Sequence, residues 1–166
     1  LASIVSLMKN IVVVGSHGKT TTTSLIASIF QETKIDPTII NGGVINSINN
    51  TAKLGKSDWS ILEADESDGS FVHITPTYSI ITNIDREHMD FYNSMQDLKK
   101  YFIRFIEKVP SFGKSFICND DKIKVEVLGF DYYNPKTGNI ESGSKKNIAM
   151  WMLDADYDEI YIMGDK

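Results

Sequence analysis

The sequence predicts an α/β fold, a doubly wound and mostly parallel sheet with a phosphate-binding loop. Segments rich in β-branched residues alternate along the chain with segments of helical periodicity, which is typical of parallel strands joined by crossover helices. The first strand candidate, 11–14, is a continuous apolar run of the kind that is buried on both faces of a sheet. A glycine-rich turn follows it directly and leads into a helical segment.

Each element is predicted from its own pattern. Short apolar runs that end at polar or glycine residues predict strands at 11–14, 38–40, 59–62, 78–82, 114–118 and, late in the chain, 158–163. A turn is predicted at 134–138. Short helical character is expected over 1–8, and a helix is expected over 19–31, with one apolar face formed by Leu25, Ile26, Ile29 and Phe30.

The clearest helix is predicted from Met95 to the proline at position 110. Its apolar residues recur at three- and four-residue steps, which places them in one stripe: Met95, Leu98, Tyr101, Phe102, Phe105, Ile106 and Val109. Ser94, with Asp97 three residues later, predicts an N-terminal cap. Pro110 cannot continue the helix, so it marks the end.

Composition and charge exclude several classes of protein. With 166 residues, 42% of them hydrophobic, the chain can bury a core and is not disordered as a whole. Its formal net charge of -5 argues against a general nucleic-acid partner. Cys118 is the single cysteine, which excludes a disulfide framework and a multi-cysteine zinc site and fits a cytoplasmic location. No apolar stretch reaches the roughly 20 residues that span a bilayer, so no membrane partner is expected.

The strongest chemical signal is the segment 15–20, which lies between a strand and a helix. Its glycines allow backbone N–H groups to surround phosphate oxygens, and a helix N-terminus favours an anion. Lys19 would reach the β- and γ-phosphates, and the Thr20 hydroxyl would hold Mg²⁺. Two residues fewer separate the glycines than in the standard phosphate loop, and an ordinary glycine-rich turn is the alternative.

Two further polar segments follow strands on the same expected edge of the sheet. An acidic run is most often solvated surface, but here it follows an apolar strand, so one of its carboxylates could complete a Mg²⁺ site; the candidates are Glu63, Asp65, Glu66 and Asp68. His88 follows the next strand. A lone histidine is more often structural than a ligand, yet this position would let a neutral imidazole bind a second divalent ion. His73 and His17 are weaker candidates.

Together these segments resemble the Mur ligase family in its central ATP-binding domain. The similarity is greatest at 15–23, 63–71 and 81–90, and 41–43 and 105–113 add to it, so that it extends through roughly residues 5–121. Within the family, the sequences of the acidic and histidine segments are most similar to those of members that join L-alanine to UDP-N-acetylmuramate.

The resemblance implies an ATP-dependent ligase of peptidoglycan precursor synthesis that uses two Mg²⁺ ions. ATP would phosphorylate the substrate carboxylate, and the amino group of L-alanine would then attack the acyl phosphate. The triphosphate would be bound by Gly15, Ser16, His17, Gly18, Lys19, Thr20 and Thr21. Lys19 would stabilise the transferring charge, Thr20 and Glu63 would hold one Mg²⁺, and His88 would hold the second. Lys19, Glu63 and His88 are therefore the implied catalytic residues.

The resemblance also implies a domain division. Residues 1–10 would end an interdomain linker, and 11–130 would form a partial ATP-binding central domain. Residues 131–166 would be an unassigned tail, with a remnant of the C-terminal part as one interpretation. An N-terminal UDP-binding domain and a C-terminal domain are expected in the parent protein. The alternatives are a sister ligase, either one that recycles muropeptides or one resembling folylpolyglutamate synthase, and a non-catalytic ATP-binding remnant.

Overall fold

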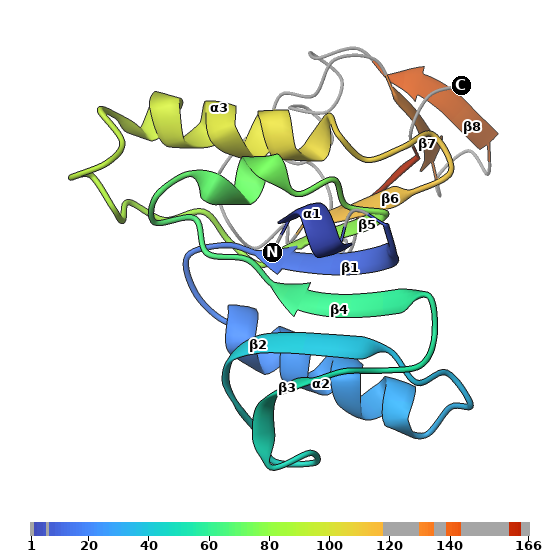
Figure 1. The fold of residues 1–166 in the computed structure, drawn as a ribbon. Coiled ribbons are helices and arrows are strands. Elements are labelled where there is room, and N and C mark those ends of the chain that lie inside the picture. Colours follow the sequence, from blue (N-terminus) through green and yellow to red (C-terminus); the bar gives the residue numbers. More distant parts are fainter. Residues whose placement is uncertain (1, 6, 118–129, 135–138, 144–159, 164–166) are drawn as a thin grey trace.

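The computed structural model describes residues 2–5, 7–117, 130–134, 139–143 and 160–163 (Figure 1). Its helical elements are α1 (Ala2–Val5), α2 (Lys19–Gln31), the 3-10 helix η1 (Ser70–His73) and α3 (Met95–Ile106). Its strands are β1 (Lys9–Val14), β2 (Thr38–Ile45), β3 (Asn50–Lys53), β4 (Trp59–Glu63), β5 (Tyr78–Ile81), β6 (Lys114–Ile117), β7 (Phe130–Asn134), β8 (Asn139–Gly143) and β9 (Ile160–Met163).

All the described strands belong to one sheet, in the order β3-β2-β4-β1-β5-β6-β9-β7-β8. The five strands from β2 to β6 in that order are mutually parallel, which confirms the predicted α/β class. Antiparallel strands extend both edges, β3 beside β2 on one side and β9, β7 and β8 beyond β6 on the other.

Strand β1 is the centre of the parallel part and explains where the site forms. After β1 the chain builds β2 and β4 on one side, and it then crosses to build β5 and β6 on the other. Loops diverge at such a switch in strand order and leave a crevice at the carboxyl ends of the strands, where ligands bind. The loops after β1, β4 and β5 are those that hold the predicted polar residues.

Two hydrophobic clusters lie on the sheet. The larger includes Val12 and Val14 of β1 and the buried stripe of α3. The smaller joins Ala27 of α2 to Ile39 and Ile45 of β2. Because side chains alternate across a strand, β1 is buried on both faces, and Val12, Val13 and Val14 are all fully buried, as the continuous apolar run predicts.

The extent of α2 is confirmed, but the composition of its buried face differs from the apolar pattern. Thr23 and Ala27 are the buried residues of this helix, whereas Leu25 and Ile29 are 62% and 64% exposed. Helix α2 contacts β1, β2 and β4, and small side chains at Thr23 and Ala27 allow it to approach them closely. The inward stripe is therefore turned by about one residue, roughly 100°, from the stripe of larger side chains.

Helix α3 follows its prediction closely. It begins at Met95, and the Ser94 side chain caps it by accepting a hydrogen bond from the Asp97 N–H at 3.1 Å. Its buried residues are Leu98, Phe102, Phe105 and Ile106. The helix ends at Ile106, four residues before Pro110, and closes with Glu107 as its C-cap.

The structure adds strands that the sequence patterns did not predict, namely β3, β7 and β8. The late strand is confirmed over Ile160–Met163, where it pairs with β6. The predicted turn lies mostly at 135–138, outside the described residues, as does position 118 of the strand predicted at 114–118. No helix within the described ranges is long and apolar enough to cross a membrane.

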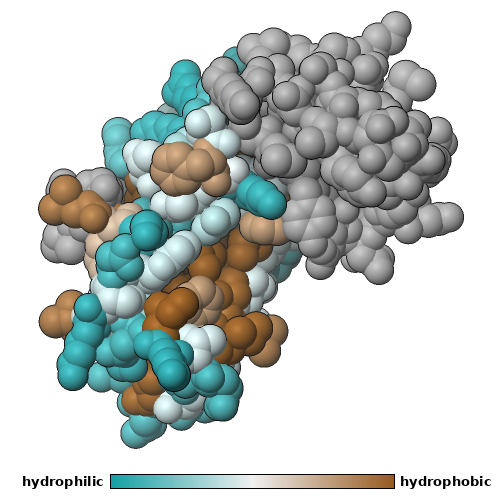
Figure 2. Space-filling view, turned by 90° about the vertical axis from the view of Figure 1, so that its right-hand side faces the viewer, coloured by the Kyte–Doolittle hydropathy of each residue, from teal (hydrophilic) through white to brown (hydrophobic). Residues whose placement is uncertain are grey.

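The end of the sheet opposite the site loops is partly apolar. Figure 2 views the molecule from the side where β1 and β4 begin and shows apolar surface between hydrophilic side chains. Four large, exposed apolar residues lie in the connections that lead into strands: Leu7, Ile35, Leu54 and Phe112. The polar residues that form the candidate site lie at the other end.

Candidate nucleotide-binding site

The loop between β1 and α2 depends on two glycines in conformations that other residues rarely adopt. Gly15 has φ of 132° and Gly18 has φ of 79°. A Cβ atom on Gly15 would lie 2.3 Å from the Thr82 hydroxyl and 2.7 Å from the Asn83 carbonyl oxygen, so the loop can only pass this close to the end of β5 with glycine there. Gly18 is the N-cap of α2 and turns the chain into the helix.

Residues after β5 hold the crest of this loop. The Asn83 side chain accepts the His17 N–H at 2.8 Å through Oδ1 and donates to the His17 carbonyl at 3.0 Å through Nδ2. The Thr82 hydroxyl donates to the same carbonyl at 2.6 Å. Ser16 Oγ accepts the Asp85 N–H at 2.8 Å. These hydrogen bonds clamp the loop to the end of the adjacent strand.

Lys19 folds back over the loop that it follows. Its Nζ atom donates to the Gly15 carbonyl at 2.6 Å and to the Ser16 carbonyl at 3.3 Å. It also donates to Glu66 Oε1 at 3.1 Å and lies 2.9 Å from Glu66 Oε2. The Lys19 side chain is 13% exposed and that of Glu66 is 1% exposed, so this is an ion pair largely removed from water.

Thr20 and Glu63 meet next to the loop. The Thr20 hydroxyl donates to Glu63 Oε1 at 3.1 Å, and Glu63 Oε2 accepts the Gly42 N–H at 2.8 Å. A Cβ atom on Gly42 would lie 3.0 Å from Glu63 Oε2, so a larger residue at position 42 would crowd this carboxylate. A hydroxyl and a carboxylate are oxygen donors of the kind Mg²⁺ prefers, and the residues present fit such an ion.

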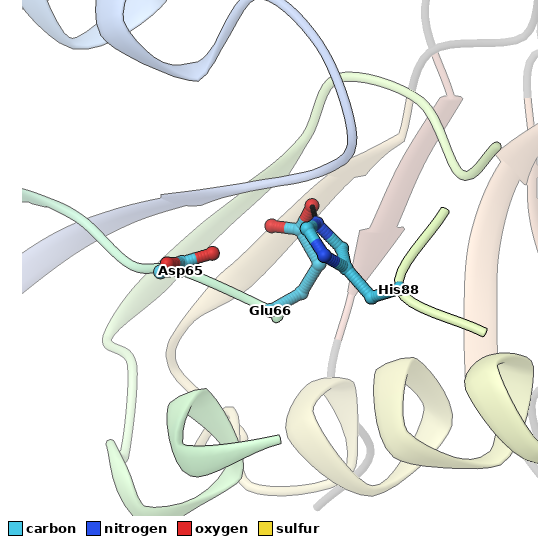
Figure 3. A group of neighbouring side chains, drawn as sticks. All are labelled: Asp65, Glu66 and His88. Atoms are coloured by element: carbon cyan, nitrogen blue, oxygen red, sulfur yellow. Dashed lines mark ion pairs between the residues drawn. The ribbon is translucent and has the colours of Figure 1, made fainter. Parts of the chain in front are cut away.

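His88 lies beside a different carboxylate. Its Nε2 atom is 3.5 Å from Glu66 Oε1, and Figure 3 shows the imidazole and the Glu66 carboxylate meeting while Asp65 stands apart on the same loop as Glu66. Ligand atoms of Asp65, Glu66 and His88 lie within 4.8 Å of one another. His88 has a left-handed backbone, with φ of 55°, and its carbonyl accepts the N–H groups of Phe91 and Tyr92 in the turn that follows.

Tyr92 connects the turn that follows His88 to the acidic loop that contains Glu66. Its buried hydroxyl donates a hydrogen bond to the Glu66 carbonyl. Burial, and after it the negative charge of Glu66, raises the pKa of Tyr92 above its ordinary value of 10.0. The hydroxyl therefore stays a donor throughout the neutral and mildly alkaline range.

The structure brings most of the sequence-predicted residues to one edge of the sheet. Thr20 meets Glu63, and Lys19 meets the acidic run, as the strand order requires. His88 lies at the same edge but contacts Glu66. Two predicted residues have other surroundings: the Thr21 side chain is exposed, and His17 Nε2 lies 3.6 Å from Asp85 Oδ2 and 3.7 Å from Glu87 Oε1.

Sequence reasoning did not single out Asn83 or Tyr92, and it gave Gly42 no role. Asn83 follows a predicted strand, so its place at the carboxyl edge was a usable signal. Tyr92 gave none, because its contact with Glu66 joins residues 26 positions apart through a turn that no periodicity marks.

The chain resembles known proteins in both sequence and fold. The Mur ligase middle domain model matches residues 13–159. A UDP-N-acetylmuramate–L-alanine ligase from Pelagibacter ubique is 68% identical over 162 residues, which is 95% of this chain and 35% of that protein. The chain thus spans about a third of the length of this relative.

Two solved structures share the fold. A UDP-N-acetylmuramate:L-alanyl-gamma-D-glutamyl-meso-diaminopimelate ligase from Neisseria meningitides is 27% identical, with a TM-score of 0.62 over 66% of this chain and 39% of that one. A UDP-N-acetylmuramate-alanine ligase from Thermotoga maritima is 30% identical, with a TM-score of 0.58 over 61% of this chain and 24% of that one. By the extent of its middle-domain match, the chain belongs to the Mur ligase family.

Proposed function

We propose that this chain supplies the ATP-binding part of a cytoplasmic ligase that joins L-alanine to the carboxylate of UDP-N-acetylmuramate in peptidoglycan synthesis. The observation that supports it most is the Thr20–Glu63 pair at 3.1 Å, set beside a glycine loop whose lysine points back across it. A nucleoside triphosphate is bound by backbone N–H groups, a cationic side chain and the ligands of a metal ion, and this edge of the sheet offers all three.

The chain's own residues would bind and orient the phosphates. The first turn of α2 presents N–H groups that no earlier helical carbonyl can accept, and its N-terminal end favours negative charge. The His17 N–H already bonds to Asn83, so His17 would shape the loop rather than donate to phosphate from its backbone. Lys19 would bring its ammonium to the transferring γ-phosphate.

The proposed metal ligands are Thr20 and Glu63 for one Mg²⁺ and His88 for a second. Bound there, Mg²⁺ would neutralise phosphate charge during transfer. Glu63 would be held for this task by Gly42 and Thr20, which fix both of its oxygens. His88 would face the acceptor side of the site.

The proposed reaction has two steps. A carboxylate oxygen of UDP-N-acetylmuramate attacks the γ-phosphorus of ATP, the bond to the β,γ-bridging oxygen breaks, and ADP leaves. The amino group of L-alanine then attacks the acyl carbon, inorganic phosphate leaves, and the nitrogen loses a proton as the amide forms. Phosphoryl transfer of this kind needs positioning and charge neutralisation more than a covalent catalyst.

The choice of substrates is supported by the 68% identity with the Pelagibacter ubique ligase. The domains that would bind the UDP moiety and the amino acid are proposed to lie in the longer parent protein, as in relatives of which this chain spans about a third. A sister ligase acting on a muropeptide is the second candidate, because the Neisseria neighbour at a TM-score of 0.62 is named for such an activity.

Two measurements test the proposal. Calorimetry with the 166-residue chain should show binding of ATP with Mg²⁺, and no binding would contradict the nucleotide site. Phosphate release by the parent protein should require UDP-N-acetylmuramate and L-alanine together. Release with L-alanyl-γ-D-glutamyl-meso-diaminopimelate in place of L-alanine would favour the sister ligase. ATP binding without any ligation would identify a non-catalytic remnant.

A further inference from the structure

Glu66 is the one charged residue among the buried side chains of the described part of the chain, with 1% of its surface exposed. The proposed function gives it no role. Burying a carboxylate is costly unless cations or donors surround it, so a residue placed this way depends on its partners. What pairs with it, and when, is therefore informative.

Two side chains from different loops face this carboxylate. Lys19 Nζ lies 2.9 Å from Oε2 and donates to Oε1 at 3.1 Å. His88 Nε2 lies 3.5 Å from Oε1 (Figure 3). Glu66 thus joins the phosphate-loop lysine to the histidine of the acceptor side.

Lys19 has no spare donor in this arrangement. An ammonium group has three N–H donors. Those of Lys19 go to the Gly15 carbonyl, the Ser16 carbonyl and Glu66. A phosphate can be bound by Lys19 only if one of these bonds is given up. Of the three acceptors, Glu66 is the anion, and it is the partner that an anionic phosphate can replace.

Lys19 is the member of the pair that can move. The Glu66 backbone is held by the Tyr92 hydroxyl and by the Gly69 N–H, which both bond to its carbonyl oxygen. Its side chain is 1% exposed. Lys19 has a flexible four-carbon stem and is 13% exposed, so its ammonium can swing from Glu66 toward the crest of the loop. Glu66 would then retain His88 as its neighbour.

We propose, resting on the nucleotide site proposed above, that Glu66 is a positioning residue for Lys19. When the nucleotide binds, Lys19 leaves the Glu66 carboxylate and pairs with the nucleotide phosphate instead. In the nucleotide-free protein, the ion pair with Glu66 holds the Lys19 ammonium beside the carbonyls of Gly15 and Ser16. Breaking this buried pair opposes nucleotide binding, so Glu66 weakens the affinity for ATP. After the exchange, Glu66 remains beside His88 and connects the filling of the phosphate site to the acceptor side.

The test is the isosteric substitution Glu66→Gln in the 166-residue chain, with ATP·Mg²⁺ affinity measured by calorimetry. We expect ATP to bind more tightly by a factor on the order of ten, because Lys19 no longer leaves a buried ion pair. The gain should shrink to about twofold in a Lys19→Met background, where only the direct repulsion between Glu66 and phosphate is removed. Equal or weaker ATP binding by folded Glu66→Gln would overturn the proposal.

Two further variants keep the test decisive. Glu66→Asp keeps the charge on a shorter side chain, loosens the contact with Lys19 and should give an intermediate gain; it replaces Glu66→Gln if that variant does not fold. Asp68→Asn removes an exposed carboxylate from the same loop and should change the affinity less than Glu66→Gln. An equal gain in ATP affinity from Asp68→Asn would mean that the lower negative charge of the protein causes the gain, and it would contradict the exchange.

The outcomes separate this inference from the proposed function. If the unsubstituted chain does not bind ATP·Mg²⁺, the nucleotide site itself is wrong. If it binds ATP and Glu66→Gln shows no gain, the site stands and the exchange is wrong. A residue with only a structural role would lower the melting temperature when substituted and would not raise ligand affinity.

Discussion

The Thr20 hydroxyl lies 3.1 Å from Glu63 Oε1, although the two residues are 43 positions apart along the chain. Strand order accounts for the meeting. Thr20 is the second residue of α2, which follows the loop after β1. Glu63 is the last residue of β4, which pairs in parallel with β1 so that Val13 lies opposite Glu63. Any carboxylate at that register would end beside the first turn of α2.

The first prediction tests Glu63 as a metal ligand. Glu63→Gln keeps an oxygen that can accept the Gly42 N–H but removes the negative charge that would hold Mg²⁺ in the proposed site. We expect the affinity for ATP·Mg²⁺ to fall by at least about tenfold, the scale on which groups supporting a metal act. Affinity for ATP in EDTA should not fall, because a charge repelling phosphate has been removed. Calorimetry with and without Mg²⁺ measures both, and an equal loss in both would argue against a metal role.

The second prediction concerns Lys19. Lys19→Met keeps the packing of the stem and removes the ammonium, so ATP affinity should fall by about 10- to 100-fold, the equivalent of about 1.5–3 kcal/mol for charge-assisted hydrogen bonds. Glu66 is left without its cation, so the melting temperature should also fall. Adding Glu66→Gln should restore stability but not affinity.

A matched lysine controls for net charge. Lys34 lies just beyond the end of α2 and is exposed. Lys34→Met should leave the ATP affinity within about twofold of that of the unsubstituted chain. Lys34 lies beyond the far end of α2 from the phosphate loop, and exposed charges so far apart are largely screened. Comparable losses from both substitutions would mean that overall charge, and not the position of Lys19, governs binding.

Much of this site followed from the sequence, because parallel strands bring their carboxyl ends together whatever their distance along the chain. That rule placed Lys19, Glu63 and His88 at one edge. It could not choose the partners within the edge, since loop conformation decides them. Glu66 rather than Glu63 became the partner of Lys19 and His88, and no pattern in the acidic run distinguishes the two carboxylates.

The errors in the fold have physical causes as well. Periodicity marks where large apolar side chains gather, but a helix that packs closely on a sheet turns its small residues inward, as Thr23 and Ala27 show. Strand β3 was not predicted because its residues, Asn50–Lys53, are mostly polar and mostly exposed at the sheet edge. Its backbone pairing with β2, not burial of side chains, makes it a strand.

The third prediction separates the two hydrogen bonds of Asn83. Asn83→Asp keeps the acceptor for the His17 N–H but loses the donor to the His17 carbonyl, whereas Asn83→Ala loses both. Each bond contributes about 1 kcal/mol, so chemical unfolding should show Asn83→Ala destabilised by about twice as much as Asn83→Asp. ATP affinity should fall in the same order, because the loop must order itself on binding. Identical unfolding curves for all three proteins would show that this clamp does not hold the loop.

The last prediction uses the pH dependence of stability to examine Tyr92. Its pKa is raised above the ordinary 10.0 in the folded protein, because burial and the nearby Glu66 disfavour the phenolate. A raised pKa means that the contribution of Tyr92 to stability is complete below about pH 10, the unfolded pKa, and is lost as the pH rises above that value.

Tyr92→Phe removes both the titration and the hydrogen bond to the Glu66 carbonyl. At pH 8 it should lower the free energy of unfolding by about 1 kcal/mol, the usual net value of one buried hydrogen bond. Between pH 8 and pH 11 the unsubstituted chain should lose more stability than Tyr92→Phe, so the two unfolding curves converge as the pH rises. Tyr101→Phe, from the same aromatic cluster, is the matched control for losing one tyrosine hydroxyl. A gap between Tyr92→Phe and the unsubstituted chain that stays constant up to pH 11 would show that the Tyr92 hydroxyl titrates no differently in the folded and unfolded protein.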